Sequence, residues 1–268
     1  MLSLKNLDSL IAIAKEAGEA IMDIYSTNFD YEIKKDDTPL TIADTTSNDI
    51  IYDSLKKLTP NIPILSEENS EIPFEERHSW KTYWLVDPLD GTKEFIQRNG
   101  DFTVNIALIE NNRPICGVIY IPVTKELFWG TKKNGSNYIN QEGCQSIINV
   151  SKKISQPIRL AMSRSHPSSE LNNVISNIER KEVITAGSSL KFCLVANGTA
   201  DCYPRFGPTS EWDTGAGEAI VIFAGGYVCQ EDGKQILYNK KSDYINSSFI
   251  VANSRELALQ ILNLKESK

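Results

Sequence analysis

Two carboxylates three residues apart form the most informative pattern in this sequence. Asp87 and Asp90 belong to the string Asp-Pro-Leu-Asp-Gly-Thr at 87–92, directly after an apolar run. Carboxylate oxygens are the ligands that Mg²⁺ prefers, and Mg²⁺ commonly shares its coordination sphere with substrate phosphates. Gly91 permits a close approach of the backbone to a ligand, and a short helix that begins at Thr92 offers amides to a phosphate. The string therefore predicts a Mg²⁺ site beside an anion site, with an Asp-Pro turn and an Asp helix cap as the alternative interpretation.

Further acidic residues strengthen the metal hypothesis. Glu67 and Glu68 follow a short apolar run, Asp44 lies near the start of a predicted helix, and Asp213 precedes a helix start rich in small residues. Each of them alone is also compatible with a helix cap or a solvated charge. Two carboxylates ~4 Å apart, however, repel each other by about 4 kcal/mol at an effective dielectric constant of about 20. A cluster of these acids therefore requires cations, and bound divalent metal would also let an acidic protein hold a phosphate.

Two basic residues are of the right type to hold a second phosphate. Lys191 lies in the string Gly-Ser-Ser-Leu-Lys-Phe-Cys at 187–193, and Arg205 lies in Tyr-Pro-Arg-Phe-Gly at 203–207. An arginine can bind a phosphate through two parallel hydrogen bonds. The alternative interpretation is a solvated lysine on a helix and an arginine in a loop.

Composition and charge exclude several classes of protein. The chain has 268 residues, with 41% hydrophobic and 24% charged residues, which is typical of a globular protein and too apolar for disorder. No apolar run approaches the roughly 20 residues of a transmembrane helix. The net charge of −7 argues against a protein that binds nucleic acid polymers, because their phosphates require a basic surface.

The cysteines and the N-terminal segment predict a cytoplasmic protein. The five cysteines are scattered without a Cys-x-x-Cys pair, which favours reduced thiols over a disulfide framework or a zinc site. With only two histidines, a His-rich metal site is excluded. Charged residues interrupt the segment 1–25, so it lacks a secretory apolar core and reads as an amphipathic helix. Peripheral association with the cytoplasmic face of the inner membrane stays open.

Hydrophobic periodicity locates the elements that must position these residues. Apolar spacing predicts helices over 7–25 and 41–58, and places Ile42 on the inward face of the second helix. Apolar runs predict short strands at 31–37 and 62–65, and a buried strand at 83–86 that ends at Asp87. Antiparallel strands follow at 102–109 and 115–121, whereas the charged segment 69–78 reads as a loop.

The pattern changes near residue 150. Beyond it, strands are predicted at 158–162, 182–185 and 200–203, alternating with helices at 168–179, 189–197 and 214–224. Such alternation is typical of an α/β architecture. We therefore predict two halves: residues 1–150 as an α+β half that carries most of the candidate metal ligands, and residues 151–268 as an α/β half. The second half carries the candidate phosphate contacts Lys191 and Arg205 and the last candidate metal ligand, Asp213.

Several motifs resemble the inositol monophosphatase superfamily of metal-dependent, lithium-sensitive phosphatases. The resemblance runs from about residue 8 to 250. It is carried by Thr-Ile-Ala-Asp at 41–44, the Glu-Glu pair at 67–68, the 87–92 string and Trp-Asp-Thr-Gly-Ala-Gly at 212–217. The longer strings at 84–96, 187–196 and 203–209 are similar to the CysQ branch, whose members are 3′(2′),5′-bisphosphate nucleotidases. Gly215 departs from this branch, which more often has Ala there, and the glycine could loosen the first turn of its helix.

The resemblance implies a layered αβαβα sandwich and removal of the 3′-phosphate from adenosine 3′,5′-bisphosphate, leaving AMP, in sulfur assimilation or nucleotide recycling. It implies two or three Mg²⁺ per site, with the metal ligands Glu67, Asp87, Asp90, Asp213 and the Leu89 carbonyl. Asp44 and Thr92 match the pair that activates water. The same resemblance assigns substrate contacts to four of the metal ligands, Glu67, Leu89, Asp90 and Asp213. In addition, it assigns them to Gly91, Thr92, His166, Ser188, Lys191 and Arg205.

Three other functions remain as alternatives. An inositol or sugar phosphatase of the same superfamily would use the same acids on another substrate. A catalytically silent phosphate-binding module would have little use for a cluster of acids that activates water. An aspartyl-phosphate phosphatase needs two Asp separated by one residue before Gly-Thr, whereas two residues separate Asp87 from Asp90.

Overall fold

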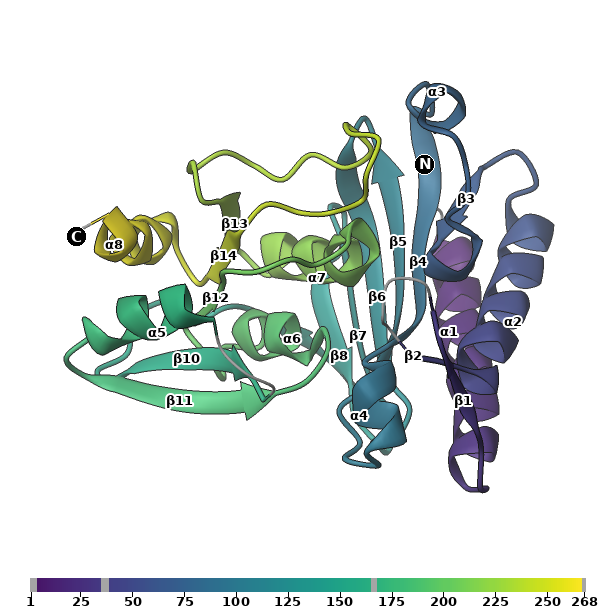
Figure 1. Cartoon of the computed structure of the whole chain (residues 1–268), viewed down its shortest axis with the longest axis horizontal. Helices are drawn as coiled ribbons and strands as arrows, with labels where there is room; N and C mark the ends of the chain where they lie inside the picture. Colours follow the sequence, from purple (N-terminus) through teal and green to yellow (C-terminus); the bar gives the residue numbers. More distant parts are fainter. Residues whose placement is uncertain (1–3, 35–38, 165–167, 267–268) are drawn as a thin grey trace.

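Five layers of secondary structure make up the fold (Figure 1). The structure is a computed structural model that describes residues 4–34, 39–164 and 168–266. The layers are, in order, α1 (Leu4–Tyr25) with α2 (Ile42–Leu58); a seven-stranded sheet; α6 (Leu190–Ala196) with α7 (Glu211–Phe223); a five-stranded sheet; and α5 (Ser169–Ser176) with α8 (Arg255–Glu266). The predicted αβαβα architecture is confirmed.

The seven-stranded sheet is almost entirely antiparallel. Its strands pair in chain order: β3 (Ile64–Ser66), β4 (Thr82–Asp90), β5 (Thr103–Glu110), β6 (Arg113–Ile121), β7 (Glu126–Thr131), β8 (Gly135–Ile139) and β9 (Gln145–Ile148). Only the pair β3 and β4 is parallel. The predicted antiparallel strands at 102–109 and 115–121 are β5 and β6. Asn111 and Asn112 join them, both with left-handed φ angles of 49° and 62°, as a two-residue hairpin turn requires.

The second sheet is mixed. Its spatial order is β11 (Lys181–Ala186), β10 (Ile158–Ser163), β12 (Cys202–Arg205), β14 (Phe249–Ala252) and β13 (Tyr227–Gln230), and β10 runs parallel to both of its neighbours. The remaining elements are a hairpin of β1 (Tyr31–Ile33) and β2 (Pro39–Thr41), the short helices α3 (Phe74–Arg77) and α4 (Thr92–Ile96), and one 3₁₀ turn, η1 (Glu67–Asn69).

The first sheet ends at Ile148 and the second begins at Ile158, on either side of the predicted boundary. The division into two domains stays a prediction.

Each sheet buries its two faces against helices, which produces three apolar clusters. One lies between α1, α2 and the first sheet, and includes Trp84 and Ile106. The second lies between the first sheet, α6, α7 and the second sheet. The third packs α5 and α8 against the outer face of the second sheet. Because α7 contributes to the central cluster, its position is set by both sheets.

Glycines let α7 lie very close to the first sheet. A Cβ atom at Gly117 of β6 would lie 2.3 Å from the carbonyl oxygen of Ala216, and one at Gly130 of β7 would lie 2.9 Å from the Cα of Ile220. Backbone atoms cannot yield as a flexible side chain can, so these two positions require glycine. Gly215 of α7 differs, since its Cβ would meet the end of the flexible Leu85 side chain, at 2.9 Å.

Three local predictions that concern helices were wrong. Segment 69–78 contains the helix α3, whose Arg77 is fully buried and donates to the Asn239 side chain, a partner far away in the sequence. Ile42 is 62% exposed, because the buried stripe of α2 runs through positions 43, 47, 51 and 55 and passes beside it. Helix α7 begins at Glu211, so Asp213 lies within its first turn and not ahead of it.

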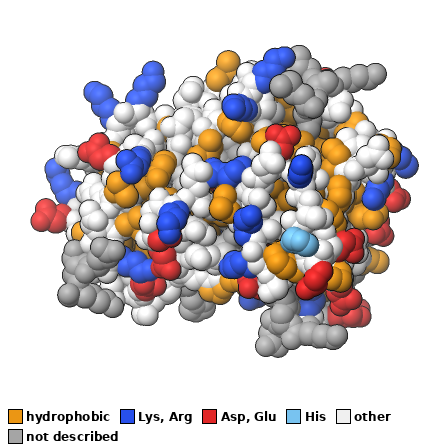
Figure 2. Space-filling model, turned by 90° about the horizontal axis from the view of Figure 1, so that it is seen from above, with side chains coloured by type: hydrophobic (Ala, Val, Ile, Leu, Met, Phe, Trp, Pro, Cys, Tyr) orange, Lys and Arg blue, Asp and Glu red, His pale blue; other side chains and the backbone are white. Residues whose placement is uncertain are grey.

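Helix length and surface charge bear on two classes of partner, membranes and nucleic acid polymers. Within the described ranges, no helix combines the length and the apolar character needed to cross a bilayer. On the face drawn in Figure 2, basic side chains of the described residues are spread over the surface, and acidic ones lie among them, mostly toward the two sides. Such a mixture gives that face no uniform basic surface to neutralise a phosphate backbone.

Gly117→Ala is expected to lower the free energy of unfolding by about 1–3 kcal/mol, because the added methyl group would push α7 off β6. Gly215→Ala is the matched control. Its clash is with a side chain that can rotate, and alanine gains up to about 1 kcal/mol of helix propensity, so we expect a change within about 1 kcal/mol. Urea unfolding measures both variants. Equal destabilisation of the two would contradict the close approach at β6.

Candidate active site

A bulge in β4 brings two carboxylates to the same side of the sheet. Asp87 pairs with Asn105 and Asp90 pairs with Thr103, so three steps along β4 match two along β5. Side chains three residues apart on a regular strand face opposite sides, whereas one extra residue in a bulge puts them on the same side. Pro88, which has no N–H for the ladder, lies within the bulge. The strand therefore continues to Asp90, and does not end at Asp87 as the sequence suggested.

Asp213 completes a group of three carboxylates. Asp87, Asp90 and Asp213 each contribute an oxygen that lies within 4.8 Å of the other two. Asp213 is the third residue of α7, where its Oδ2 accepts a hydrogen bond of 2.8 Å from the Ser210 backbone N–H in a capping box. The Asp90 carboxylate accepts hydrogen bonds from Ser188 Oγ at 2.7 Å and from Asn105 Nδ2 at 3.3 Å. Residues far apart in the sequence thus converge on one point.

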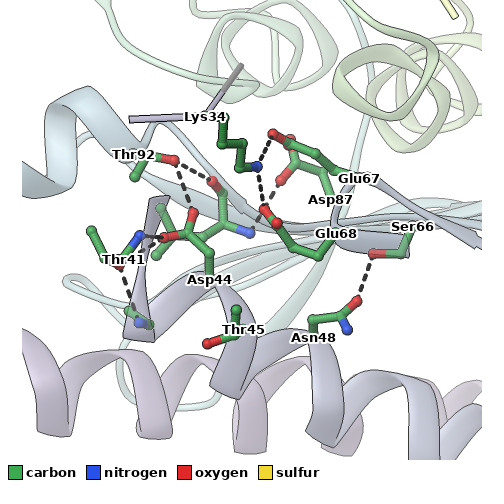
Figure 3. Close-up of polar contacts among 12 residues, drawn as sticks. Lys34, Thr41, Asp44, Thr45, Asn48, Ser66, Glu67, Glu68, Asp87 and Thr92 are labelled. Carbon is green, nitrogen blue, oxygen red and sulfur yellow. Dashed lines mark hydrogen bonds and ion pairs between the residues drawn. The ribbon is translucent and has the colours of Figure 1, made fainter. Parts of the chain in front are cut away.

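Glu67 lies beside this group and is paired with a lysine (Figure 3). It opens the turn η1 directly after β3. Lys34 Nζ, next to the β1 strand, donates to Glu67 Oε1 at 3.0 Å and to Glu68 Oε1 at 2.6 Å. Glu67 is not among the three carboxylates that meet within 4.8 Å. No sequence pattern pointed to Lys34, because its contact depends on how the β1–β2 hairpin lies against η1.

Burial and mutual repulsion raise the pKa values of Asp87, Asp213 and Glu67. Burial raises the pKa of Asp87 well above its usual range, and the charges of Glu67, Asp90 and Asp213 add to the effect. The pKa of Asp213 is raised in the same way, first by burial and then by Asp90 and Glu67. Burial raises the pKa of Glu67 to about 7 although Lys34 opposes the shift. Without cations the cluster therefore holds protons near neutral pH.

The donor set fits a hard divalent cation. It consists of carboxylate oxygens with the Leu89 backbone nearby, and Mg²⁺ selects oxygen ligands of this kind. No histidine or cysteine is part of the group found among the described residues. A dication would replace the bound protons and remove the repulsion between the acids.

Asp44 and Thr92 form a hydrogen-bonded pair beside the cluster (Figure 3). Thr92 Oγ1 donates to Asp44 Oδ1 at 2.9 Å, and Asp44 Oδ2 accepts from the N–H and the Oγ1 of Thr41 at 2.7 and 2.6 Å. Asp44 is thus the third residue of a capping box on α2 and also the partner of Thr92. Gly91 precedes Thr92 with a left-handed φ of 93°, which redirects the chain into α4. Burial raises the pKa of Asp44 above its ordinary value.

Two cavities meet at the acidic cluster. The larger, called the main cavity, has a volume of about 880 Å³ and is lined by Glu67, Asp87, Leu89, Gly91 and Thr92, among others. The smaller, called the side cavity, measures about 220 Å³ and is lined by Ser188, Lys191 and Arg205, among others. Four residues line both cavities: Asp90, Lys93, Glu94 and Asp213. A ligand at the cluster can therefore extend from one cavity into the other.

The predicted nucleotide contacts line the side cavity where they are described. Ser188 adopts a left-handed φ of 50°. Lys191 is only 4% exposed and donates to the backbone carbonyls of Ala186 and Ser188, so the interpretation as a solvated lysine is wrong. Burial lowers the pKa of Lys191 to about 8. Arg205 donates to Ser163 Oγ at 3.2 Å and to the Pro208 carbonyl at 3.0 Å. His166 lies outside the described residues.

Comparison with known proteins gives consistent matches over nearly the whole chain. The inositol monophosphatase family profile matches residues 4–267. A Salmonella typhimurium protein named 3′(2′),5′-bisphosphate nucleotidase CysQ is 44% identical over 247 residues, covering 91% of this chain and 98% of that protein. A protein of the same name from Escherichia coli K12 is 43% identical over 248 residues, covering 92% and 99%.

Solved structures agree with the sequence matches. CysQ from Bacteroides thetaiotaomicron, described as a bacterial member of the inositol monophosphatase family, superposes with a TM-score of 0.80 at 39% identity, covering 91% of this chain and 96% of that one. A Thermotoga maritima IMPase superposes with a TM-score of 0.81 at 23% identity, covering 98% and 97%. The second match concerns the fold alone.

The raised pKa values predict an unusual dependence of stability on pH. Unfolded carboxyls release their protons near pH 4, whereas Glu67 in the folded, metal-free protein holds its proton to about pH 7. The unfolded chain then binds fewer protons between these values, so the free energy of unfolding falls as pH rises through this window. In EDTA we expect a lower Tm at pH 8 than at pH 5, and a larger rise in Tm with MgCl₂ at pH 8. Differential scanning calorimetry measures both.

Asp87→Asn tests the origin of this effect. Removing one buried charge should raise the Tm of the metal-free protein at pH 8 and abolish the rise with MgCl₂. Asp53→Asn, at an exposed position on α2, is the matched control and should behave as the wild type. An Asp87→Asn protein that still gains stability from MgCl₂ as the wild type does would show that the metal is held elsewhere.

Proposed function

Since the chain belongs to the inositol monophosphatase family, we propose that it is a 3′(2′),5′-bisphosphate nucleotidase that hydrolyses adenosine 3′,5′-bisphosphate to AMP and phosphate. The observation that carries this assignment is the 44% identity to a nucleotidase of that name over 98% of its length. The enzyme is thus a phosphoric monoester hydrolase with a small nucleotide as its substrate. The side cavity beside the acidic cluster supports a substrate with two phosphates.

The metal ligands in this proposal are Glu67, Asp87, Asp90, Asp213 and the Leu89 carbonyl, with two or three Mg²⁺ per site. When bound, Mg²⁺ lowers the pKa of water and neutralises the charge of the reacting phosphate. The protein contributes the arrangement of the acids. The β4 bulge, η1 and the first turn of α7 each hold their carboxylates on rigid elements, so little reorganisation is needed on binding.

Thr92 and Asp44 move the proton of the attacking water. The Thr92 hydroxyl already donates its hydrogen to Asp44 at 2.9 Å, so its oxygen lone pairs are left to accept a hydrogen bond from water. As the water attacks phosphorus, its proton passes to Thr92 Oγ1 while the Thr92 proton passes to Asp44 Oδ1. The raised pKa of Asp44 suits it to accept that proton near neutral pH.

The substrate's two phosphates occupy different parts of the site in this proposal. The backbone amides of Gly91 and Thr92 bind the scissile phosphate next to the acids, where α4 begins. Ser188, Lys191 and Arg205 face the second phosphate in the side cavity. His166 is a further proposed contact.

The free cysteines of the structure fit a reducing compartment, and we place the enzyme in the cytoplasm.

Asp44→Asn is expected to lower kcat by a factor of about 10² to 10⁴, because an amide cannot take the proton from Thr92. KM should change by less than about threefold, since Asp44 reaches the substrate only through Thr92. Steady-state release of phosphate with saturating MgCl₂ measures both constants, and Asp53→Asn again serves as the control. Turnover near that of the wild type would refute the role of Asp44.

Substrate comparison tests the function itself. We expect kcat/KM for adenosine 3′,5′-bisphosphate to exceed that for inositol 1-phosphate at least tenfold, and EDTA to abolish both activities. The reverse preference would identify an inositol or sugar phosphatase. Failure to release phosphate from either compound, with and without MgCl₂, would identify a silent binding module.

A further inference from the structure

Three cations line the side cavity alone, and the protein itself engages part of their donors. Lys191 uses two of its three donors on the carbonyls of Ala186 and Ser188. Arg164 donates to Asp101 Oδ2 at 2.7 and 3.2 Å through two of its nitrogens. Arg205 donates to Ser163 and Pro208, whereas its buried Nε has no partner. A dianionic phosphate in this cavity would therefore meet a spare donor on Arg205 and would need a further cation to balance its charge.

Lys93 differs from these three residues. It is exposed, and among the described residues no hydrogen bond or ion pair engages its ammonium group. It also lines both the main and the side cavity, whereas Lys191, Arg164 and Arg205 line only the side cavity. Its neighbours at this junction are the carboxylates Asp90, Glu94 and Asp213, so it is the single cation among the residues that the structure describes there.

We propose that Lys93 is a specificity residue that binds the phosphate of the substrate that is not hydrolysed. The inference rests on the proposed function, because it assumes a nucleotide that carries two phosphates on one ribose. With the scissile phosphate at the acidic cluster, the second phosphate lies one ribose away. Lys93 stands where the two cavities join, and its long side chain can reach either side.

The chemistry of the junction favours this role. A lysine is a mobile point charge with three donors, which suits a phosphate whose position depends on the sugar between two anions. Lys93 follows Thr92 directly in the short helix α4. The same helix therefore holds Thr92, which accepts the proton of the attacking water, and Lys93, which binds the second phosphate. Charge recognition at Lys93 would thereby favour bisphosphates over monophosphates.

Paired substrates separate this role from a general effect on activity. For Lys93→Met we expect kcat/KM to fall about ten- to hundred-fold with adenosine 3′,5′-bisphosphate, as the loss of a charge-assisted hydrogen bond implies. With adenosine 3′-phosphate, which lacks the second phosphate, kcat/KM should stay within about twofold. Lys93→Arg should retain most of the activity on the bisphosphate. Lys57→Met, at an exposed position on α2, is the matched control and should leave both values unchanged.

Each other outcome has a distinct meaning. An equal loss on both substrates would overturn the proposal, since Lys93 would then serve the scissile phosphate or the fold. No loss on the bisphosphate would overturn it as well. If the wild-type protein releases no phosphate from either nucleotide, the proposed function itself fails, and this result is visible before any variant is made.

Discussion

Repulsion between buried carboxylates is the constraint on which this structure depends. Asp87, Asp90 and Asp213 meet within 4.8 Å, with Glu67 beside them, and burial raises the pKa values of Asp87, Asp213 and Glu67. Such an arrangement costs stability, because these three buried acids would be more easily ionised in water. A fold tolerates this cost where the costly group performs a task, and the task that we propose for these acids is to hold divalent cations beside a phosphate. The rest of the molecule acts to keep these acids together.

Ordinary devices of local structure supply the necessary rigidity. A bulge turns two residues of β4 to the same side, and capping boxes at the start of α2 and α7 hold Asp44 and Asp213 by their backbone hydrogen bonds. Each of these aspartates therefore caps the start of its helix and also lies at the candidate site. The sequence alone left two interpretations of these residues, a helix cap and a functional acid, and under the proposed function both apply.

Sequence patterns could predict the parts of the site that depend on local order. The string at 87–92, the acids Asp44 and Asp213 and the five-layered fold follow from spacing, residue type and resemblance, and the structure brings these residues together. The contact of Lys34 with Glu67 could not be predicted from the sequence, because it depends on the packing of the β1–β2 hairpin against the distant turn η1. The burial of Arg77 was missed for the same reason, because its partner Asn239 lies in a late loop. The roles assigned to the site residues stay predictions.

The position of α7 has a consequence for biosynthesis. The first sheet is complete when the ribosome has passed β9, yet its inner face, with the bare backbone at Gly117 and Gly130, is covered only by a helix that emerges much later. The apolar face of this sheet therefore stays exposed while most of the remaining chain is translated. Exposed apolar surface of this kind promotes aggregation with other chains. Chaperones that shield such surfaces would be needed most during this interval, and the chelating pocket would close as one of the final events of maturation.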